Sequence, residues 1–366
     1  MSQNQVFRTD VVGSFLRPAP LRQAFKQRSA GEIDDEALRR AQDEAIRGIV
    51  RVQEEAGLPV ATDGEFRRGW WWGRFVERVD GLTIKPAVVK FRDDKGHEVQ
   101  GIGPYATAKL RRTRPIAVDE FIFLRDATKL TAKITIPAPS TIHFHRHNSF
   151  ADPSVYPNLK GFMADLIALY REEIADLAKE GCRYLQLDDV SIALLCDPEF
   201  RAGIDAAGGN AQELADIYID AINQVIANRP AGMTVGVHVC RGNFSGHYVG
   251  ISSYDWIAER FFQKTAVDRF LLEYDSPRAG DFSPLRFVPK DKVVVLGLVT
   301  TKSPAMETID ALKRRVDEAT RYVPLERLAF SPQCGFASTA RGNPVTEDDQ
   351  RAKLRLVVDA AKAIWG

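Results

Sequence analysis

Cysteine is scarce in this chain, with four residues among 366, so a disulfide framework is excluded. No hydrophobic run approaches the roughly 18 residues of a membrane-spanning helix, and the amino terminus lacks the charged and apolar segments of a secretory signal. The formal net charge of +1 creates no overall field that would attract nucleic acid or an anionic membrane. These absences predict a cytoplasmic protein whose thiols are free to bind metal or to react.

The chain also lacks repeats, low-complexity segments and recognisable linkers, which predicts a single domain over residues 1–366. What it contains is an alternation of short apolar runs and longer amphipathic segments. The apolar runs lie at 10–14, 58–65, 131–140, 182–189, 233–240, 269–275, 292–301 and 327–335. Several of them are nearly continuous in Val, Ile and Leu, which is typical of parallel strands buried on both faces.

Apolar residues at helical spacing mark the segments between these runs. The predicted helices lie at 33–56, 161–180, 211–228, 253–264, 306–320 and 346–365. Eight strand–helix units predict an α/β fold of the TIM (β/α)8 barrel type. An insertion with a β-hairpin is expected after strand two, at about 70–125. A doubly wound sheet is the alternative, but no Gly-rich phosphate loop follows the first run.

His238 and Cys240 end one of the apolar runs, two residues apart. On a strand, residues i and i+2 face the same way, so the imidazole and the thiol would point at one object. The alternative is a buried histidine and a buried cysteine in an ordinary core strand. In a barrel the active site forms at the carboxyl ends of the strands, and Glu273 and Cys334 end two further runs there.

Together, His238, Cys240, Glu273 and Cys334 predict a Zn2+ site, because thiolate and imidazole are preferred zinc ligands. Their spacing does not match a metal-binding loop that is contiguous in sequence. The site therefore requires that the strands at 233–240, 269–275 and 327–335 lie close together around a ring. Two thiolates and a carboxylate would carry a formal charge of about −3 against +2 from zinc. Such an electron-rich site suits the binding and deprotonation of a thiol better than the generation of hydroxide.

Several short motifs occur in the order found in one enzyme family. The chain resembles the carboxyl-terminal catalytic barrel of cobalamin-independent methionine synthases, above all the single-barrel, methyltetrahydropteroyltriglutamate–homocysteine methyltransferase-like members. The matching motifs are VGSF at 12–15, DGE at 63–65, LDD at 187–189, HVC at 238–240, Glu273 before YDSPR, KSP at 302–304 and CG at 334–335. They span nearly the whole chain, and their joint order is more specific than any single motif.

The resemblance implies that homocysteine binds zinc through its sulfur. By motif, the amino and carboxylate groups of homocysteine would meet Gly13, Ser14, Glu65 and Asp188. Backbone N–H groups suit a carboxylate, and the two acidic side chains suit an ammonium group. The alternative for Glu65 and Asp188 is an ion pair with Arg67 or Arg183 at the barrel mouth.

Three departures from the family pattern concern the methyl donor. Longer members carry an amino-terminal barrel that helps to hold a polyglutamylated folate, whereas this chain has one barrel. A tryptophan at the end of strand three is replaced here by a segment with His143, Phe144, His145 and His147. Within it, His145 would orient a substrate or cap a loop. The family's histidine before SP is Lys302 here, a weaker acid unless burial lowers its pKa.

The sequence therefore predicts a zinc-dependent thiol methyltransferase that converts homocysteine to methionine with a methylfolate-type donor. The thiolate would attack the methyl carbon in line, with Lys302 and Asp188 as catalytic residues. The aromatic run at 69–75 would either stack on the donor or pack under the insertion.

Other functions are left open by the sequence. Within the class of thiol alkyltransferases, the electrophile could instead be an epoxide, a methyl-corrinoid or a small methylated donor. A uroporphyrinogen-decarboxylase-like lyase and a non-enzymatic metal-binding module are the alternatives from other classes. No nucleic-acid or membrane partner is predicted, and a homo-oligomer is left open.

Overall fold

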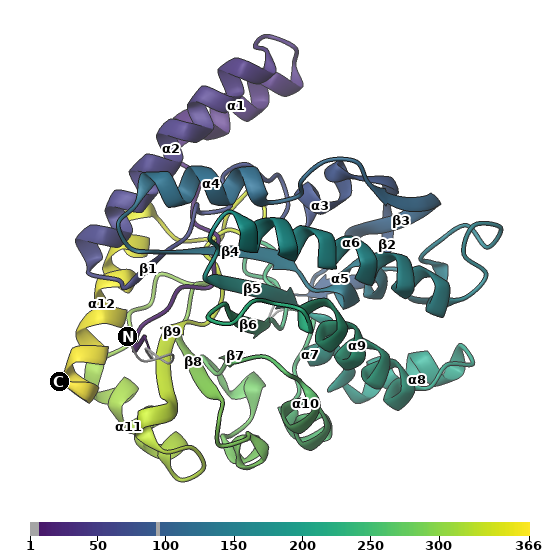
Figure 1. Ribbon diagram of the computed structural model, residues 1–366. Helices are drawn as coiled ribbons and strands as arrows, with labels where there is room; N and C mark the ends of the chain where they lie inside the picture. The colour runs from purple at the N-terminus through teal and green to yellow at the C-terminus, as the bar shows by residue number, and fades with distance from the viewer. Residues whose placement is uncertain (1–6, 93–95) are drawn as a thin grey trace.

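Seven parallel strands form the centre of the computed structural model, which describes residues 7–92 and 96–366. The strands are β1 (Val60–Ala61), β4 (Thr131–Pro137), β5 (Tyr184–Asp189), β6 (Thr234–Val239), β7 (Arg269–Glu273), β8 (Val293–Val299) and β9 (Leu328–Pro332). Each strand pairs with the next in this order. Figure 1 shows the curved sheet with helices around it. The predicted α/β barrel is confirmed, and seven of the eight apolar runs contain one of its strands.

The remaining run, at 10–14, closes the ring without forming a regular strand. Thr9 makes a parallel bridge to Phe330 in β9, and Ser14 makes one to Gly64 just after β1. The segment therefore lies between the first and last strands of the sheet, as a barrel requires. The prediction of a strand at 10–14 is wrong because the pairing is limited to these isolated bridges.

Side chains inside the barrel explain why this segment is irregular. The carbonyls of residues 11, 12 and 13 accept hydrogen bonds from, in order, Lys133 Nζ (2.6 Å), Gln186 Nε2 (2.6 Å) and Thr62 Oγ1 (2.7 Å). A regular strand would direct its carbonyls to the backbone of its neighbours. Here buried side chains replace those partners, so the backbone is satisfied without a ladder.

Asp10 anchors the same segment in the barrel interior. Its carboxylate accepts hydrogen bonds from Lys133 Nζ (2.7 Å) and from the hydroxyl of Tyr184, and Arg269 Nη1 lies 3.6 Å from it. All four side chains are buried. A buried carboxylate is costly unless cations and donors compensate it, and three strands supply those groups here.

Helices cover the outside of the ring. The longer helices are α1 (Ala19–Ser29), α2 (Asp35–Ala56), α4 (Val118–Ala127), α6 (Leu159–Lys179), α8 (Pro198–Ala206), α9 (Ala211–Ile226), α10 (Ala258–Lys264), α11 (Ile309–Thr320) and α12 (Glu347–Trp365). Shorter ones are α3 (Gly73–Arg78), α5 (Pro139–Phe144) and α7 (Ser191–Leu195), with 3-10 turns at His147–Ser149, Tyr254–Trp256, Pro277–Ala279, Ser283–Phe287 and Leu325–Arg327. Each of the six predicted helical segments overlaps one α-helix, although α6 begins two residues before the predicted 161–180 and the predicted 253–264 is divided into a 3-10 turn and α10. Among the described residues, no helix is long and apolar enough to cross a membrane.

Local sequence signals explain the ends of the best predicted helices. Asp34 caps α2 by accepting a hydrogen bond from the Ala37 N–H (2.8 Å), and Gly57 ends the helix with a φ of 83°. A capping box between Thr346 and Asp349 starts α12. In Figure 1, α1 and the adjoining part of α2 extend beyond the barrel as a helical arm.

A β-hairpin is added between β1 and α4, within the predicted insertion. It consists of β2 (Val79–Arg92) and β3 (Glu98–Arg112), which pair in antiparallel fashion. The hairpin docks beside α5, where the Val88 N–H donates a hydrogen bond to the His145 carbonyl (2.8 Å). A Cβ at Gly103 would lie 2.3 Å from His145 Cβ, so this approach requires glycine. The single-domain organisation stays a prediction.

We predict that Asp10→Ala lowers the free energy of unfolding by about 3–5 kcal/mol, because it removes the buried carboxylate that Lys133 Nζ contacts at 2.7 Å. Unfolding in guanidinium chloride, followed by circular dichroism, measures the change. The matched control is Glu36→Ala, which breaks an exposed ion pair with Arg40 and should cost less than about 1 kcal/mol. Equal effects of the two substitutions would contradict the anchoring role of Asp10.

Candidate metal and substrate site

The four predicted metal ligands meet at the carboxyl ends of the strands. His238 lies in β6, Cys240 follows that strand, Glu273 ends β7, and Cys334 lies two residues beyond β9. One ligand atom from each residue lies within 4.8 Å of every other, and all four residues are buried. The structure therefore brings together four groups that are separated by up to 96 positions in the sequence.

His238 presents one ring nitrogen that has no partner in the described residues. Its Nδ1 donates a hydrogen bond to the Leu271 carbonyl (3.3 Å), whereas the buried Nε2 has no hydrogen-bond partner. A histidine that ligates a metal usually donates its other N–H in this way, which fixes the ring. Burial lowers the pKa of His238, but the nearby Cys334 and Asp188 outweigh burial and raise it overall.

The two thiols lie close together but are not joined. Cys240 Sγ and Cys334 Sγ are 3.5 Å apart, well beyond the roughly 2.05 Å of a disulfide. Two sulfurs bound to one tetrahedral zinc would be separated by about 3.8 Å, so the observed spacing fits a shared ion. The hydrogen bond between the thiols lowers the pKa of Cys334 and raises that of Cys240, which favours one thiolate here.

Glu273 is held at this cluster by three neighbours. Its Oε1 accepts a hydrogen bond from the Arg241 backbone N–H (2.8 Å), and its Oε2 lies 3.4 Å from Lys302 Nζ and 3.5 Å from Gln333 Nε2. The orientation of Gln333 is fixed, because its Oε1 accepts from the Thr301 N–H (2.7 Å). These contacts compensate a carboxylate that is otherwise buried among apolar strand residues.

Acidic and small residues lie beside the metal-ligand cluster. Ser14, Glu65 and Asp188 line the same pocket as His238 and both thiols. Gly13 does not line it, but its backbone packs on Glu65, since a Cβ there would lie 2.8 Å from Glu65 Oε1. Of the predicted substrate-binding residues, Ser14, Glu65, Asp188 and His145 are therefore placed around one pocket, and Gly13 supports it.

Neither of the arginines weighed as alternatives pairs with Glu65. Arg67 binds Asp43 (2.6 Å). Arg68 is the arginine that approaches Glu65, at 3.9 Å, and it lies closer to Glu120, at 2.7 Å. The Thr135 hydroxyl donates to Glu65 Oε1 (3.0 Å), and Glu65 Oε2 has no hydrogen-bond partner among the described residues. One carboxylate oxygen thus remains available to a ligand.

Burial changes the acidity of both pocket carboxyl groups. It raises the pKa of Glu65 to about 8, against an opposing effect of Arg68, and raises the pKa of Asp188 to about 6. Gln186 Nε2 donates to Asp188 Oδ1 (2.6 Å). A positively charged group brought between these acids would restore their ionised forms.

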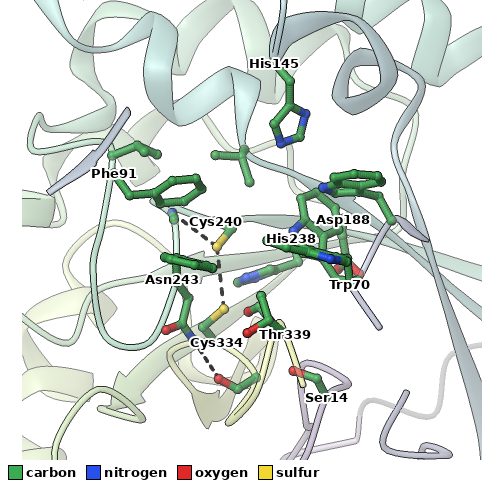
Figure 2. Close-up of a pocket in the computed structure, with 18 of the residues that line it drawn as sticks. Ser14, Trp70, Phe91, His145, Asp188, His238, Cys240, Asn243, Cys334 and Thr339 are labelled. Carbon is green, nitrogen blue, oxygen red and sulfur yellow. Dashed lines mark hydrogen bonds between the residues drawn. The ribbon is translucent and has the colours of Figure 1, made fainter. Parts of the chain in front are cut away.

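Aromatic side chains form much of the remaining pocket wall. They come from the segment after β1, from the hairpin, from α5 and from the loop after β6, and are Trp70, Trp71, Trp72, Phe91, Phe144 and Phe244. In the view of Figure 2, Phe91 and His145 lie above the two sulfurs and Ser14 lies below them. The aromatic run at 69–75 therefore contributes to the pocket as well as to packing beneath the hairpin.

The histidines after β4 have different environments. His145 lines the pocket, donates through Nδ1 to the Thr141 carbonyl (2.9 Å), and has a pKa lowered to about 4 by burial. His143 is instead buried against the Tyr218 hydroxyl (2.7 Å), with a pKa lowered to about 3 by burial. His145 is thus neutral at pH 7, and His143 has a packing role.

Lys302 lies behind the ligand cluster and does not line the pocket. Its ammonium group is nearly buried beside Glu273. Burial lowers the pKa of Lys302, but Glu273 and Asp275 outweigh burial and raise it overall. The burial that would have made this lysine a stronger acid is therefore offset by its acidic neighbours.

Three polar residues of the site were not found from the sequence. Thr135 and Gln186 point inward from β4 and β5, and Gln333 precedes Cys334. A polar residue inside an apolar run was the available signal, since such a side chain must find a partner in the barrel. Phe91 and Phe244 had no comparable signal, because their contact depends on how two separate loops fold over the ring.

Comparisons with known proteins identify the family of this chain. The family described as "Cobalamin-independent synthase, Catalytic domain" matches residues 7–363. YxjH of Bacillus subtilis (strain 168), which carries the description uncharacterized, is 40% identical over 98% of this chain and 95% of its own length. The methionine synthase of Pyrococcus abyssi is 24% identical over 97% of this chain and 91% of its own.

A solved structure is similar over the whole chain. It comes from Listeria monocytogenes, is described as a candidate vitamin-B12-independent methionine synthase, and is 34% identical. The match covers 99% of this chain and 100% of that one, with a TM-score of 0.76. These matches confirm the predicted family and the predicted enzyme class, a methyltransferase. The chain belongs to the cobalamin-independent synthase family, and it contains the catalytic domain of that family.

Proposed function

We propose that this protein is a zinc-dependent thiol methyltransferase that converts homocysteine to methionine with a methylfolate-type donor. The observation that carries the proposal is the convergence of His238, Cys240, Glu273 and Cys334, with ligand atoms within 4.8 Å of one another. The description of the Listeria and Pyrococcus relatives as methionine synthases supports the same reaction. The family match favours a transferase over the decarboxylase-like alternative.

The ligand set fits zinc. Two sulfurs, an imidazole nitrogen and a carboxylate oxygen are ligands that zinc accepts in tetrahedral sites, and His238 Nε2 is buried without another partner. When bound there, zinc would supply Lewis acidity that lowers the pKa of an incoming thiol. Cys240 and Cys334 would share the negative charge at the site, and Lys302 would offset part of the charge of Glu273.

We predict about one zinc per chain, with loss of the metal in Cys240→Ala and Cys334→Ala. Cys182→Ala and Cys196→Ala are matched controls that should keep the zinc, because neither thiol belongs to the four-residue cluster. Burial also raises the pKa of both thiols to about 12, which disfavours the thiolate that a metal needs. Metal content after gel filtration, measured by mass spectrometry, gives the comparison. Zinc retained by both site variants would refute the proposed ligand set.

The pocket would place the amino-acid part of homocysteine beside the cluster. Glu65 and Asp188 would bind its ammonium group, with the free Glu65 Oε2 as one acceptor. Ser14 lies at the same pocket wall and would contact the carboxylate. His145 would orient the substrate from the opposite wall. This arrangement holds the sulfur near the metal ligands and restricts its direction of attack.

We predict that methionine binding weakens as pH falls from 8.5 to 6.5, by up to about tenfold per pH unit below the pKa of Glu65. The sign follows because the ammonium group binds the ionised carboxylate, which is lost below a pKa of about 8. Methionine is used because its thioether does not titrate. Calorimetry over this range should show weaker binding with a flatter profile for Glu65→Gln, and extending it to pH 5.5 should show a residual step near pH 6 from Asp188.

Glu77→Gln is the matched control, because burial also raises the pKa of this carboxyl outside the pocket. It should leave the pH profile of methionine binding unchanged. An unchanged profile in Glu65→Gln would remove Glu65 from the proposed ammonium site.

Methyl transfer itself is tested with homocysteine and a panel of donors. The panel contains methylfolate, its polyglutamates and methylcobalamin, and methionine is the measured product. Cys334→Ala should reduce the rate by roughly a hundredfold or more if zinc activation contributes about 3 kcal/mol to the barrel's catalysis. If no donor yields methionine while zinc remains bound, the specific reaction is wrong, and another thiol alkylation is indicated.

Lys302 is proposed to deliver the proton to the leaving atom of a methylfolate donor, and Asp188 to assist catalysis by holding the substrate. Both roles stay predictions, as do a cytoplasmic location and the absence of nucleic-acid and membrane partners. A homo-oligomer is untested. Lys302 contacts Glu273 rather than the pocket, so proton delivery would require its side chain to turn toward the donor.

A further inference from the structure

The pocket beside the thiol site has an aromatic wall built by elements outside the barrel strands. Phe91 from the hairpin contacts Phe244 from the loop after β6, with ring centroids 5.4 Å apart. Trp70 lies parallel to Phe244 at 5.8 Å, with planes 4° apart. These three rings are half-buried, so they border the space that a second substrate would enter.

Among the described residues that line this pocket, none is a lysine or an arginine. Its ionisable lining consists of Glu65, Asp188, His238, His145 and the two thiols. An anionic donor entering this space would therefore find no basic side chain to pair with, whereas a cationic donor would meet none that repels it.

Three basic side chains of the surrounding structure have partners outside the pocket. Lys302 lies against Glu273, Arg68 binds Glu120, and the Arg241 guanidinium lies over the Tyr254 ring at 4.3 Å. None of the three lines the pocket. A positive charge at the aromatic wall would therefore have to come from a bound ligand, because no lysine or arginine of the described lining supplies one.

From this combination we infer that the pocket accepts a small methyl-bearing onium cation, a sulfonium or a quaternary ammonium, as a further methyl donor. Aromatic faces bind such cations through the ring quadrupole, and no lysine or arginine of the described pocket lining opposes them. The inference rests on the proposed function, because the methyl acceptor is the thiol held at the metal ligands. It adds a second class of donor to the methylfolate type.

The reaction of such a donor is balanced without a proton. The homocysteine thiolate attacks the methyl carbon, so a sulfur–carbon bond forms while the bond from that carbon to the onium sulfur or nitrogen breaks. The bonding electron pair stays with the leaving atom, which departs as a neutral thioether or tertiary amine. No acid is needed in the aromatic wall, which agrees with the position of Lys302 outside it.

The apolar wall also favours this step. Thiolate and onium are opposite charges that disappear as two neutral products form. An environment that solvates ions poorly disfavours the separated charges more than the transition state between them. Trp70, Phe91 and Phe244 would exclude water from the methyl group and thereby promote the transfer.

The test uses the zinc-loaded full chain with homocysteine and either trimethylsulfonium or tetramethylammonium. We expect methionine together with equimolar dimethyl sulfide or trimethylamine, with the sulfonium reacting faster because its thioether is the better leaving group. Uncharged tert-butanol, of similar size, should not compete with the sulfonium. Competition by tert-butanol as strong as that by tetramethylammonium would overturn recognition of the charge.

Substitutions locate the binding to the aromatic wall. Phe91→Leu should raise the KM for trimethylsulfonium by about fivefold or more, as expected for the loss of one cation–π contact. The KM for homocysteine should change by less than about twofold, because the Phe91 ring offers no polar group to the amino-acid part of the substrate and packs on Phe244. Phe91→Tyr should restore the sulfonium KM, and the remote Phe287→Leu should change neither value. Equal rises in both KM values for Phe91→Leu would refute a specific role in donor binding.

A spectroscopic measurement separates the two proposals. In the Co2+-substituted protein, homocysteine should alter the absorption bands of the metal when its sulfur binds. If homocysteine alters these bands but neither onium yields methionine, the onium inference is wrong and the proposed thiol activation stands. If homocysteine leaves the bands unchanged, the proposed function fails and the inference fails with it.

Discussion

The capture of the first segment by side chains inside the barrel is the interaction on which the site depends. Residues 11–13 give their carbonyls to Lys133, Gln186 and Thr62, and Asp10 binds the same lysine. These bonds close a ring whose first and last strands would otherwise be unpaired edges. Closure brings the segment that carries Ser14 beside the end of β9, so the substrate pocket and Cys334 become neighbours. The buried hydrogen bonds of residues 10–13 therefore both close the ring and position the wall of the proposed substrate pocket.

Strand register in this closed ring then brings together the four residues proposed to bind a metal. His238 pairs with Leu271, two positions before Glu273, and Glu273 pairs with Gly297 in β8. Glycine is needed at 297, since a Cβ would lie 2.8 Å from the Cα of Gln333. The close approach lets Gln333 reach Glu273 and places Cys334 at the cluster. A shift of one residue in any of these strands would turn its ligand away from the centre.

The sequence predicted the parts of the molecule that depend on local pattern. Apolar runs located seven strands and helical spacing located six helices, and the four candidate metal ligands were named from the ends of the runs and from motif order. The irregular segment at 10–14 escaped prediction, because its hydrogen bonds come from side chains more than 45 positions away. The contact of Phe91 with Phe244 escaped for the same reason, since neither residue belongs to a periodic pattern. Tertiary contacts between loops carry no local signal.

The carboxyl ends of the barrel strands, which carry the proposed metal ligands, are covered in this chain by the hairpin of β2 and β3 and by the segment around Trp70. The hairpin reaches the ring only because Gly103 allows contact with His145, and the Trp70 segment is bridged to Thr339, five residues after Cys334. The cover is therefore tied to the same strand ends that hold the thiols. Water near a thiolate stabilises its charge and slows its attack on carbon, so excluding water raises its reactivity. In the proposed reaction the aromatic wall would affect the reactivity of the sulfur as well as the choice of donor, because the same loops would exclude water from the thiol and border the space in front of it.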